Sequence, residues 1–258
     1  MAIKGDLAQI LSGMPVVIKE CNLIISQPRI KTIVAYGEDI FFTGLQVFTE
    51  VEKITKPLKE GNPRLSMLSD FQLLIVAIQE EKALKELIKD LFEIIFPNYF
   101  YQIDPGLINF YLKEDKKKEK IVGQLNPNNF SVFQDSLKQV FLPIGSSSSQ
   151  ESYNPANEAA KAIAEKLKRG NEIRRELKQN DSKMGTSLFA SYVSILSIGL
   201  AMDINTFYNY TPFQLYDAFF RYTAKTAFDF YQKVITTPMM DTSGIKEPKN
   251  WMENIYEQ

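Results

Sequence analysis

Histidine is absent from the 258-residue sequence, and cysteine occurs once, at Cys21. Without histidine, Ser-His-Asp and Cys-His catalytic arrangements and metal sites built on imidazole are excluded. A single cysteine also excludes an internal disulfide. Cys21 lies in an apolar segment with no histidine to activate its thiol, so we interpret it as a packing residue rather than a nucleophile.

Long apolar runs and an excess of charge of one sign are also missing. The longest apolar stretches, Phe71–Ile78 and Tyr192–Met202, are far shorter than the roughly 20 residues that a membrane helix needs. The 30 basic and 31 acidic residues give a net charge of −1, so no overall field attracts nucleic acid or anionic lipid. Because the first residues lack the apolar core of a signal peptide, we expect a cytoplasmic protein with no membrane partner.

Motifs for catalysis and cofactor binding are missing as well. The sequence contains no phosphate-binding loop, dinucleotide fingerprint, nucleophile elbow, zinc-protease motif or calcium loop. We therefore expect a protein that is not an enzyme, with no catalytic residues, no metal site and no cofactor.

A serine-rich segment, Gly145–Asn157, divides the chain. Four successive serines with a glycine and a proline cannot fill a core, which predicts a linker or mobile loop. We place this linker at residues 144–157, between a mixed α+β domain at 1–143 and a helical domain at 158–258. The expected fold class is mainly α within α+β, with a few strands and a hairpin in the N-terminal part.

The N-terminal part alternates β-branched segments with segments of helical spacing. The expected elements, in chain order, are a strand at Val16–Ile25, a short helix between Pro28 and Gly37, a helix at Glu38–Lys53, a capping box at Ser69–Gln72, an amphipathic helix at Leu84–Ile95, a hairpin of Leu107–Leu112 with Lys120–Leu125, and a helix at Phe130–Phe141.

The C-terminal part has only helical patterns. Pro155–Lys178 places apolar residues on a narrow seam, and Ser187–Met202 predicts a mostly apolar, buried helix. Asp203–Tyr210 is interpreted as a turn with aromatic residues. Thr211–Gln214 combines a capping box with proline at the first helical position, so it predicts a helix that continues to about Thr236.

Basic residues concentrate between Lys161 and Lys183, where eight basic residues accompany four acidic ones. One interpretation is a surface, including Lys166 and Arg169, that contacts phosphate or an acidic partner. The alternative, which the spacing favours, is a solvated face with ion pairs between residues three or four apart. No aromatic residue is interleaved to stack on bases, so we do not expect nucleic acid as a partner.

Aromatic residues concentrate in the helix that begins after Thr211, which contains eight of them. Tyr216, Phe220, Thr223, Ala227, Phe230 or Tyr231, and Val234 form one stripe that is typical of a core. Other aromatic residues lie beyond this stripe: Phe213, Phe219, Tyr222 and Phe228. Such a helix is either buried on most sides or offers a surface to a partner or to a second copy.

Several C-terminal motifs together resemble a known family. They are Asn154-Pro155-Ala156-Asn157, Ala160-Lys161, Glu165–Arg169, Tyr192–Ile204, Gln214–Asp217, Arg221-Tyr222 and Asn250–Met252, with a weaker likeness at Ile25–Phe42. In this layout the chain resembles tail assembly chaperones of long-tailed phages and of phage-like particles of Gram-positive bacteria.

The resemblance implies a protein that binds the tape-measure protein, or other tail proteins, while the tail tube assembles around it. It implies no catalytic residue. The partner-binding candidates are Phe213, Phe219, Tyr222, Lys166 and Arg169. Two alternatives stay open: a structural tail or baseplate subunit that remains in the particle, and a nucleic-acid-binding accessory protein. Self-association also stays open.

Overall fold

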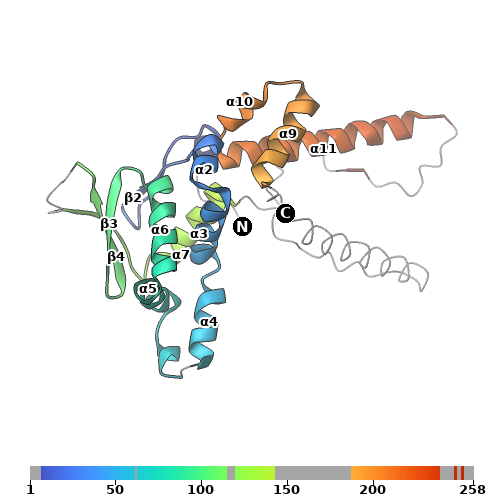
Figure 1. The fold of residues 1–258 in the computed structure, drawn as a ribbon. Coiled ribbons are helices and arrows are strands. Elements are labelled where there is room, and N and C mark those ends of the chain that lie inside the picture. The colour runs from blue at the N-terminus through green and yellow to red at the C-terminus, as the bar shows by residue number, and fades with distance from the viewer. Residues whose placement is uncertain are drawn as a thin grey trace, which may run out of the picture.

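The computed structural model describes residues 7–61, 63–114, 120–142, 187–238, 247–248 and 251–252. The described chain is a mainly helical α+β fold, in which the strands lie in the N-terminal part and the C-terminal part contributes helices (Figure 1). This confirms the predicted fold class. The predicted linker at 144–157, the helix at 155–178 and both predicted domain boundaries lie outside the described residues.

The N-terminal part contains the following elements in chain order: α1 (Leu7–Leu11), β1 (Val16–Ile18), β2 (Leu23–Ile25), α2 (Ile30–Tyr36), α3 (Glu38–Thr49), α4 (Glu52–Gly61), a 3-10 turn at Pro63–Met67, α5 (Asp70–Glu80), α6 (Lys82–Ile95), β3 (Tyr99–Asp104), β4 (Leu107–Leu112), β5 (Ile121–Leu125) and α7 (Phe130–Phe141). The C-terminal part contains α9 (Leu188–Leu200), α10 (Ile204–Tyr208) and α11 (Pro212–Thr236).

Both predicted capping boxes are present. At the start of α5, the Gln72 amide donates to Ser69 Oγ at 3.2 Å, and the Ser69 amide donates to Gln72 Oε1 at 3.0 Å. At the start of α11, the Thr211 amide donates to Gln214 Oε1 at 2.9 Å, and the reciprocal distance is 3.3 Å. Each box satisfies two amides that have no partner within the helix, which explains why these boundaries follow from four residues of sequence.

The predicted strand at Val16–Ile25 is wrong in detail, because this segment is a tight hairpin. β1 and β2 pair antiparallel, with Val16 opposite Ile25 and Ile18 opposite Leu23. The polar residues between them form the turn, which closes through Asn22 at a φ of 51°. Asparagine tolerates this left-handed conformation better than most residues, so the β-branched run reverses direction at this point.

The larger sheet has the order β3-β4-β5 and is antiparallel throughout. The predicted hairpin of β4 with β5 is confirmed. The third strand, β3, was not predicted, and it pairs with the other edge of β4 from Tyr99 opposite Leu112 to Asp104 opposite Leu107. β4 therefore lies in the centre, and its Ile108 and Phe110 are fully buried.

The turn of the β1–β2 hairpin is docked on β5 through buried Asn129. The Asn129 side-chain amide donates to the carbonyl oxygens of Glu20, at 3.1 Å, and Gln124, at 2.8 Å. Its Oδ1 accepts from the amide of Asn126 at 2.9 Å. Gly123 allows this contact, because a Cβ there would lie 2.8 Å from the carbonyl oxygen of Asn22.

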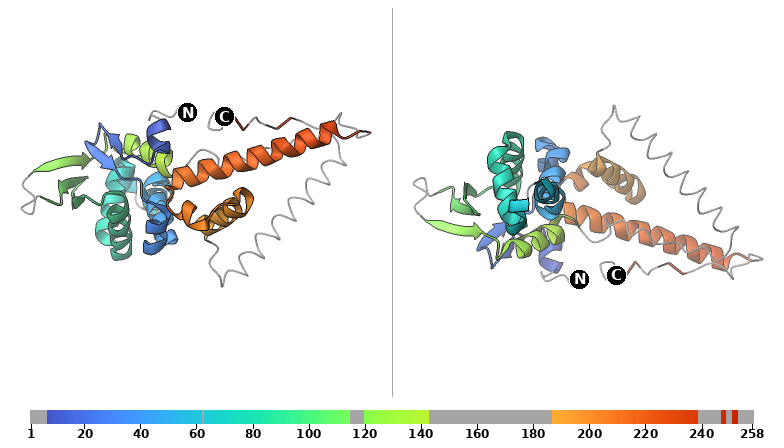
Figure 2. Two further views of the ribbon diagram at one scale, coloured as in Figure 1. Left: turned by 90° about the horizontal axis from the view of Figure 1, so that it is seen from above. Right: turned by 90° about the horizontal axis from the view of Figure 1, so that it is seen from below.

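One cluster of buried side chains includes residues from before residue 142 and from after residue 187. Phe42 on α3 meets Phe189 on α9 with ring centroids 5.2 Å apart, and Phe41 meets Phe141 of α7 at 5.5 Å. Leu215 and Tyr216 at the start of α11 belong to the same cluster. The C-terminal helices therefore pack into the core of the N-terminal part, while the rest of α11 projects away from it (Figure 2).

We predict that Asn129→Ala lowers the free energy of unfolding by about 1–3 kcal/mol, because two backbone carbonyls and one amide lose their buried partner. Urea unfolding monitored by circular dichroism measures the change. The matched control is Asn128→Ala, since Asn128 is an exposed neighbour in the same turn. Equal, small losses in both variants would contradict the role of Asn129.

Candidate functional site

The start of α9 is held by a carboxylate from α3. Glu38 Oε1 accepts from the amides of Leu188, at 2.6 Å, and Phe189, at 3.3 Å, and the Ser187 hydroxyl donates to Glu38 Oε2. Ser187 Oγ in turn accepts from the amide of Ala190 at 3.0 Å. The first amides of a helix lack partners within it and carry a partial positive charge, so a carboxylate at this end is stabilising.

Beyond this point α9 packs along α11 through aromatic residues. Tyr192 stacks on Phe219 with ring centroids 4.0 Å apart, and Phe189 meets Tyr216 at 6.2 Å. Near the end of α9, Gly199 faces Tyr222, and a Cβ at this glycine would collide with the tyrosine ring. Burial raises the pKa of the Tyr216 hydroxyl, which therefore stays neutral at physiological pH.

The predicted partner-binding aromatic residues lie mostly inside this contact. Phe213 is 1% exposed and packs with Ile10 of α1, which contradicts a partner-facing position because its ring belongs to the core. Phe219 and Tyr222 are half-buried against α9. Lys166 and Arg169 lie outside the described residues.

The predicted core stripe of α11 is interrupted beyond its start. Tyr216 is buried, and Phe220, Tyr231 and Val234 are half-buried, but Ala227 is exposed and Phe230 is 68% exposed. The reason is length. α11 has 25 residues and spans roughly 37 Å at 1.5 Å per residue, whereas α9 has 13 residues and ends near Tyr222. The distal part of α11 therefore extends beyond the helix that covers its base.

Two other expectations for the C-terminal part also need correction. The helix at Ser187–Met202 is present as α9, but it is only half-buried, since Ile198 is 81% exposed. The segment Asp203–Tyr210, expected as a turn, contains the short helix α10, which Asp203 caps by accepting from the amide of Asn205 at 2.9 Å.

Several large apolar side chains of the C-terminal helices are exposed, and they are here together called the α9–α11 surface. Ile195 and Ile198 share one side of α9, Leu200 and Met202 lie at its end and in the turn that follows, and Phe230 lies on distal α11. Phe219, Tyr222, Thr226 and Phe230 follow one another at helical spacing, so Phe230 continues the stripe that α9 covers further back.

The α9–α11 surface carries almost no charge. No charged residue occurs between Lys183 and Asp203 in the sequence. On α11 four charged side chains form two pairs, with Arg221 Nε 3.1 Å from Asp217 Oδ1 and Lys225 Nζ 2.7 Å from Asp229 Oδ2, while exposed Lys233 lies one helical turn beyond Phe230. Exposed apolar side chains with few charges among them are suited to contact with an apolar partner.

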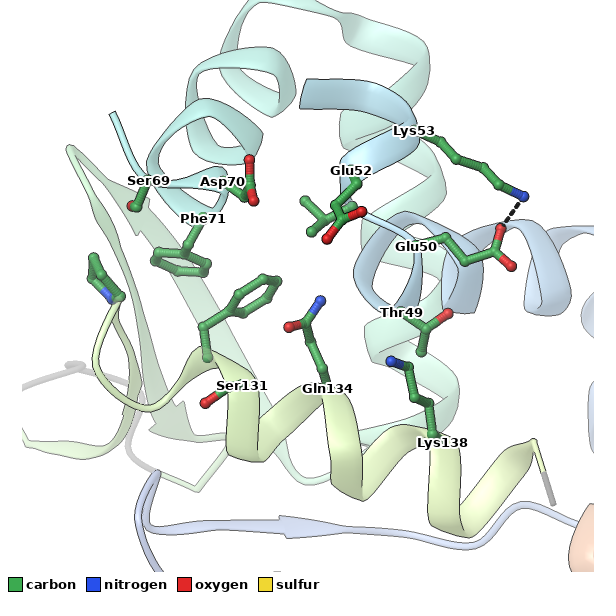
Figure 3. A pocket seen from close by; sticks show the side chains of 13 residues that line it. Thr49, Glu50, Glu52, Lys53, Ser69, Asp70, Phe71, Ser131, Gln134 and Lys138 are labelled. Carbon is green, nitrogen blue, oxygen red and sulfur yellow. Dashed lines mark ion pairs between the residues drawn. The ribbon is translucent and has the colours of Figure 1, made fainter. Parts of the chain in front are cut away.

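A separate pocket of about 540 Å³ lies where α3, α5 and α7 meet (Figure 3). Phe71 and Phe130 form an apolar wall, with ring centroids 4.8 Å apart. Around it are side chains of both charges, among them Glu50 and Lys53, which pair at 2.5 Å. Because acidic and basic side chains both line it, the pocket has no charge of a single sign that would select a ligand.

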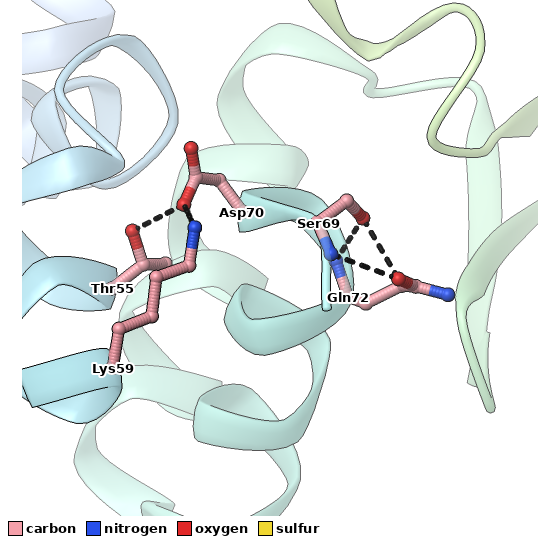
Figure 4. A network of polar contacts seen from close by, with 5 residues as sticks. All are labelled: Thr55, Lys59, Ser69, Asp70 and Gln72. Atoms are coloured by element: carbon pink, nitrogen blue, oxygen red, sulfur yellow. Dashed lines mark hydrogen bonds and ion pairs between the residues drawn. The ribbon is translucent and has the colours of Figure 1, made fainter. Parts of the chain in front are cut away.

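Asp70 at the edge of this pocket has a structural role. Its Oδ1 accepts from Lys59 Nζ and from Thr55 Oγ1, each at 2.7 Å (Figure 4). The hydrogen bond from Lys59 is the main cause that lowers the pKa of the Asp70 carboxyl, with Thr55 adding to it, against the opposing effect of burial. Asp70 is therefore an ionised tie between α4 and α5.

The described residues contain neither a metal-ligand cluster nor a membrane-spanning helix. Among the described residues, no group of three or more cysteine, aspartate or glutamate side chains gathers in a way that would hold a metal ion. In the same part of the chain, no helix combines the length and apolar character needed to cross a membrane.

Comparison with known proteins relates one part of the chain to a family. A model described as the YomV second domain matches residues 178–256, which include α9, α10 and α11. YomV is a phage-derived protein, so the match relates the C-terminal part of the chain to phage proteins. No curated protein and no solved structure matches the chain.

We predict that Glu38→Ala lowers the free energy of unfolding by about 1–2 kcal/mol, since the first amides of α9 lose an anionic partner. Glu38→Gln should lower it less, because the amide oxygen still accepts hydrogen bonds. Thermal melting measures both. Asp39→Ala removes a neighbouring, exposed carboxylate from the same turn of α3 and serves as the control. A loss no larger than in this control would show that the cap contributes nothing.

We predict a pH-dependent effect of Asp70→Asn. Because the folded-state pKa of Asp70 is lowered, its contribution is present above the unfolded pKa of about 3.9 and disappears as pH falls through the folded pKa. The variant should be less stable than the parent at pH 7, and the difference should shrink below about pH 4. Urea unfolding at several pH values tests this, with exposed Glu60→Gln as control. A difference that is constant with pH would contradict the lowered pKa.

Proposed function

We propose that the chain is a non-enzymatic phage tail assembly chaperone that binds the tape-measure protein during tail-tube assembly. The observation that carries the proposal is the α9–α11 surface, a set of exposed apolar side chains on helices whose sequence matches a phage-associated domain. The motifs that resemble tail assembly chaperones occur in the same part of the chain. A chaperone of this kind has to cover apolar segments of another chain before that chain is assembled.

The geometry of the surface suits a helical partner. Ile195 and Ile198 lie at helical spacing on the exposed side of α9, and Phe230 continues the stripe of α11 beyond the end of α9. The exposed apolar side chains of α9 therefore follow helical spacing, and Phe230 adds an aromatic contact on α11. A helix with apolar residues at three- and four-residue spacing is a partner that such contacts fit. Phe230 is the aromatic residue of the surface, and aromatic residues are enriched in the buried cores of protein interfaces.

We predict that the double variant Ile198→Asp with Phe230→Asp folds normally but no longer captures the tape-measure protein. Both side chains are largely exposed, at 81% and 68%, so a charge there costs folding little and places an unpaired carboxylate in the interface. The measurement is co-purification of co-expressed, tagged tape-measure protein, beside thermal melting of the variant.

The control is Met67→Asp, which introduces the same charge at a side chain that is 92% exposed in the N-terminal part. Capture by the double variant at the level of this control would overturn the proposed surface. Mass spectrometry of purified particles tests the role itself, because a chaperone is absent from finished tails. Presence in fixed stoichiometry would identify a structural subunit instead.

A further inference from the structure

The two outer edges of the larger sheet differ in what covers them. At β5 the turn of the β1–β2 hairpin is docked, and the amide of Gln124 donates to the carbonyl oxygen of Cys21 at 3.0 Å. At the outer edge of β3, no strand of the described residues is paired. β3 has six residues and lacks a bulge, a proline and a lysine, which are the features that usually protect an edge strand. The edge of β3 is therefore open to pairing with another strand.

Two residues of β3 offer both backbone groups at this edge. The amide of Lys113 donates to the carbonyl oxygen of Asn98 at 2.9 Å, so even-numbered residues of β3 bond to β4 and odd-numbered residues point away from it. Tyr99 points away as well, but its amide already donates within the turn that precedes the strand. Tyr101 and Ile103 are therefore the residues that present an amide and a carbonyl oxygen to a neighbouring strand.

The position of α6 under the sheet suits a second copy of the same sheet. Phe92 of α6 lies between β3 and β4, with its ring centroid 5.0 Å from that of Tyr101 and 5.5 Å from that of Phe110. When two copies join their β3 strands about a two-fold axis, their α6 helices lie two strand spacings apart, or roughly 10 Å. Packed helices have their axes about 8–10 Å apart. The two α6 helices would thus pack against each other and run antiparallel.

The side of α6 that would form this contact is exposed. It carries charged residues at three- and four-residue spacing, whose side chains are between 41% and 89% exposed: Lys82, Glu86, Lys89 and Glu93. The opposite side of α6 packs on α3, where Leu91 contacts Gly44. Burial raises the pKa of the Tyr101 hydroxyl to about 12, and the negative charge of Glu93 adds to this shift. Glu93 therefore lies near β3, on the free side of the helix.

The charges of α6 suit an antiparallel neighbour with the same sequence. The first turn contains Lys82 and Lys85 and no acidic residue, and the last turn contains Glu93 and no basic residue. This distribution is the reverse of the one that stabilises a helix by itself, because the start of a helix is already partly positive and its end partly negative. In an antiparallel pair the basic start of one α6 lies beside the acidic end of the other, and each compensates the other.

We propose that two copies of the chain associate through β3 into a dimer with one continuous antiparallel sheet, below which the two α6 helices pack together. The two-fold axis passes at Gln102. Tyr101 of each copy then lies opposite Ile103 of the other, and each such pair exchanges both of its backbone hydrogen bonds. The dimer contains no residue of the α9–α11 surface and does not rest on the proposed function.

An introduced disulfide tests the pairing. With the axis at Gln102, the two Gln102→Cys positions face each other with Cα atoms about 4.5 Å apart, which is within reach of a disulfide. Phe100→Cys is the control on the same face of the same strand, because its two copies would lie roughly 14 Å apart. Cys21 adds little background, since it is 2% exposed and burial raises its pKa to about 12.

We predict that mild oxidation links Gln102→Cys into a covalent dimer at least roughly tenfold more than Phe100→Cys, as measured on non-reducing gels of the full-length chain. Preferential linkage of Gln102→Cys would support the pairing. Equal linkage of the two variants, preferential linkage of Phe100→Cys, or no linkage of either would overturn it.

Exchange of charges on α6 tests the helix contact. The variant Lys82→Glu with Lys85→Glu makes both ends of α6 acidic, and the variant Asp90→Lys with Glu93→Lys makes its end as basic as its start. We predict that each variant alone dimerises at least roughly tenfold more weakly than the parent, and that an equimolar mixture forms a heterodimer of about the parent's affinity. Analytical ultracentrifugation measures all four samples, and circular dichroism checks that each variant is folded.

Restoration in the mixture requires that the start of one α6 meets the end of the other, so a general loss of stability would not reproduce it. Variants that dimerise like the parent, or a mixture that remains as weak as its components, would overturn the α6 contact. A parent chain that stays monomeric at every concentration measured would overturn the dimer, and it would leave the proposed function untouched.

Discussion

The carboxylate of Glu38 at the start of α9 is the contact on which the arrangement of the C-terminal helices depends. It joins residues 150 positions apart in sequence and fixes where α9 begins on the surface of α3. Once that point is set, Phe189 enters the common core beside Phe42, and Tyr192 and Gly199 meet α11. A hydrogen-bonded charge at a helix end is directional, whereas apolar packing tolerates rotation of a helix about its axis. Glu38 therefore helps to determine which side of α9 packs against the core, and the opposite side is left exposed.

Sequence patterns predicted those features that depend on residues close together in the chain. The capping boxes at Ser69 and Thr211 and the amphipathic helix α6 are of this kind, since each is decided within one or two helical turns. β3 was missed because its pairing with β4 becomes evident only once the β4–β5 hairpin leaves an edge free. The reversal inside Val16–Ile25 was missed because β-branched residues on both sides of Asn22 suit one long strand as well as two short ones.

The candidate site shows the same division between local and long-range information. A helix that is apolar on most sides gives no unique facing, so the sequence could not decide which aromatic residues of α11 are covered. Phe213 is buried because α1 packs against it. Phe230 is exposed because α9 is too short to reach it. Gly199 is the sequence signal that could have predicted the contact between α9 and α11. A glycine within an apolar helix indicates close approach of another element, and here that element is α11, through Tyr222.

Exposed apolar side chains on helices carry a cost, because they favour non-specific association in the cell. On α11 two ion pairs limit this cost, Arg221 with Asp217 and Lys225 with Asp229, because they keep charged groups on the same helix as the exposed Phe230. A helix with charges in place of its exposed apolar side chains would avoid the cost, but it would also lack the contact area that the proposed partner needs.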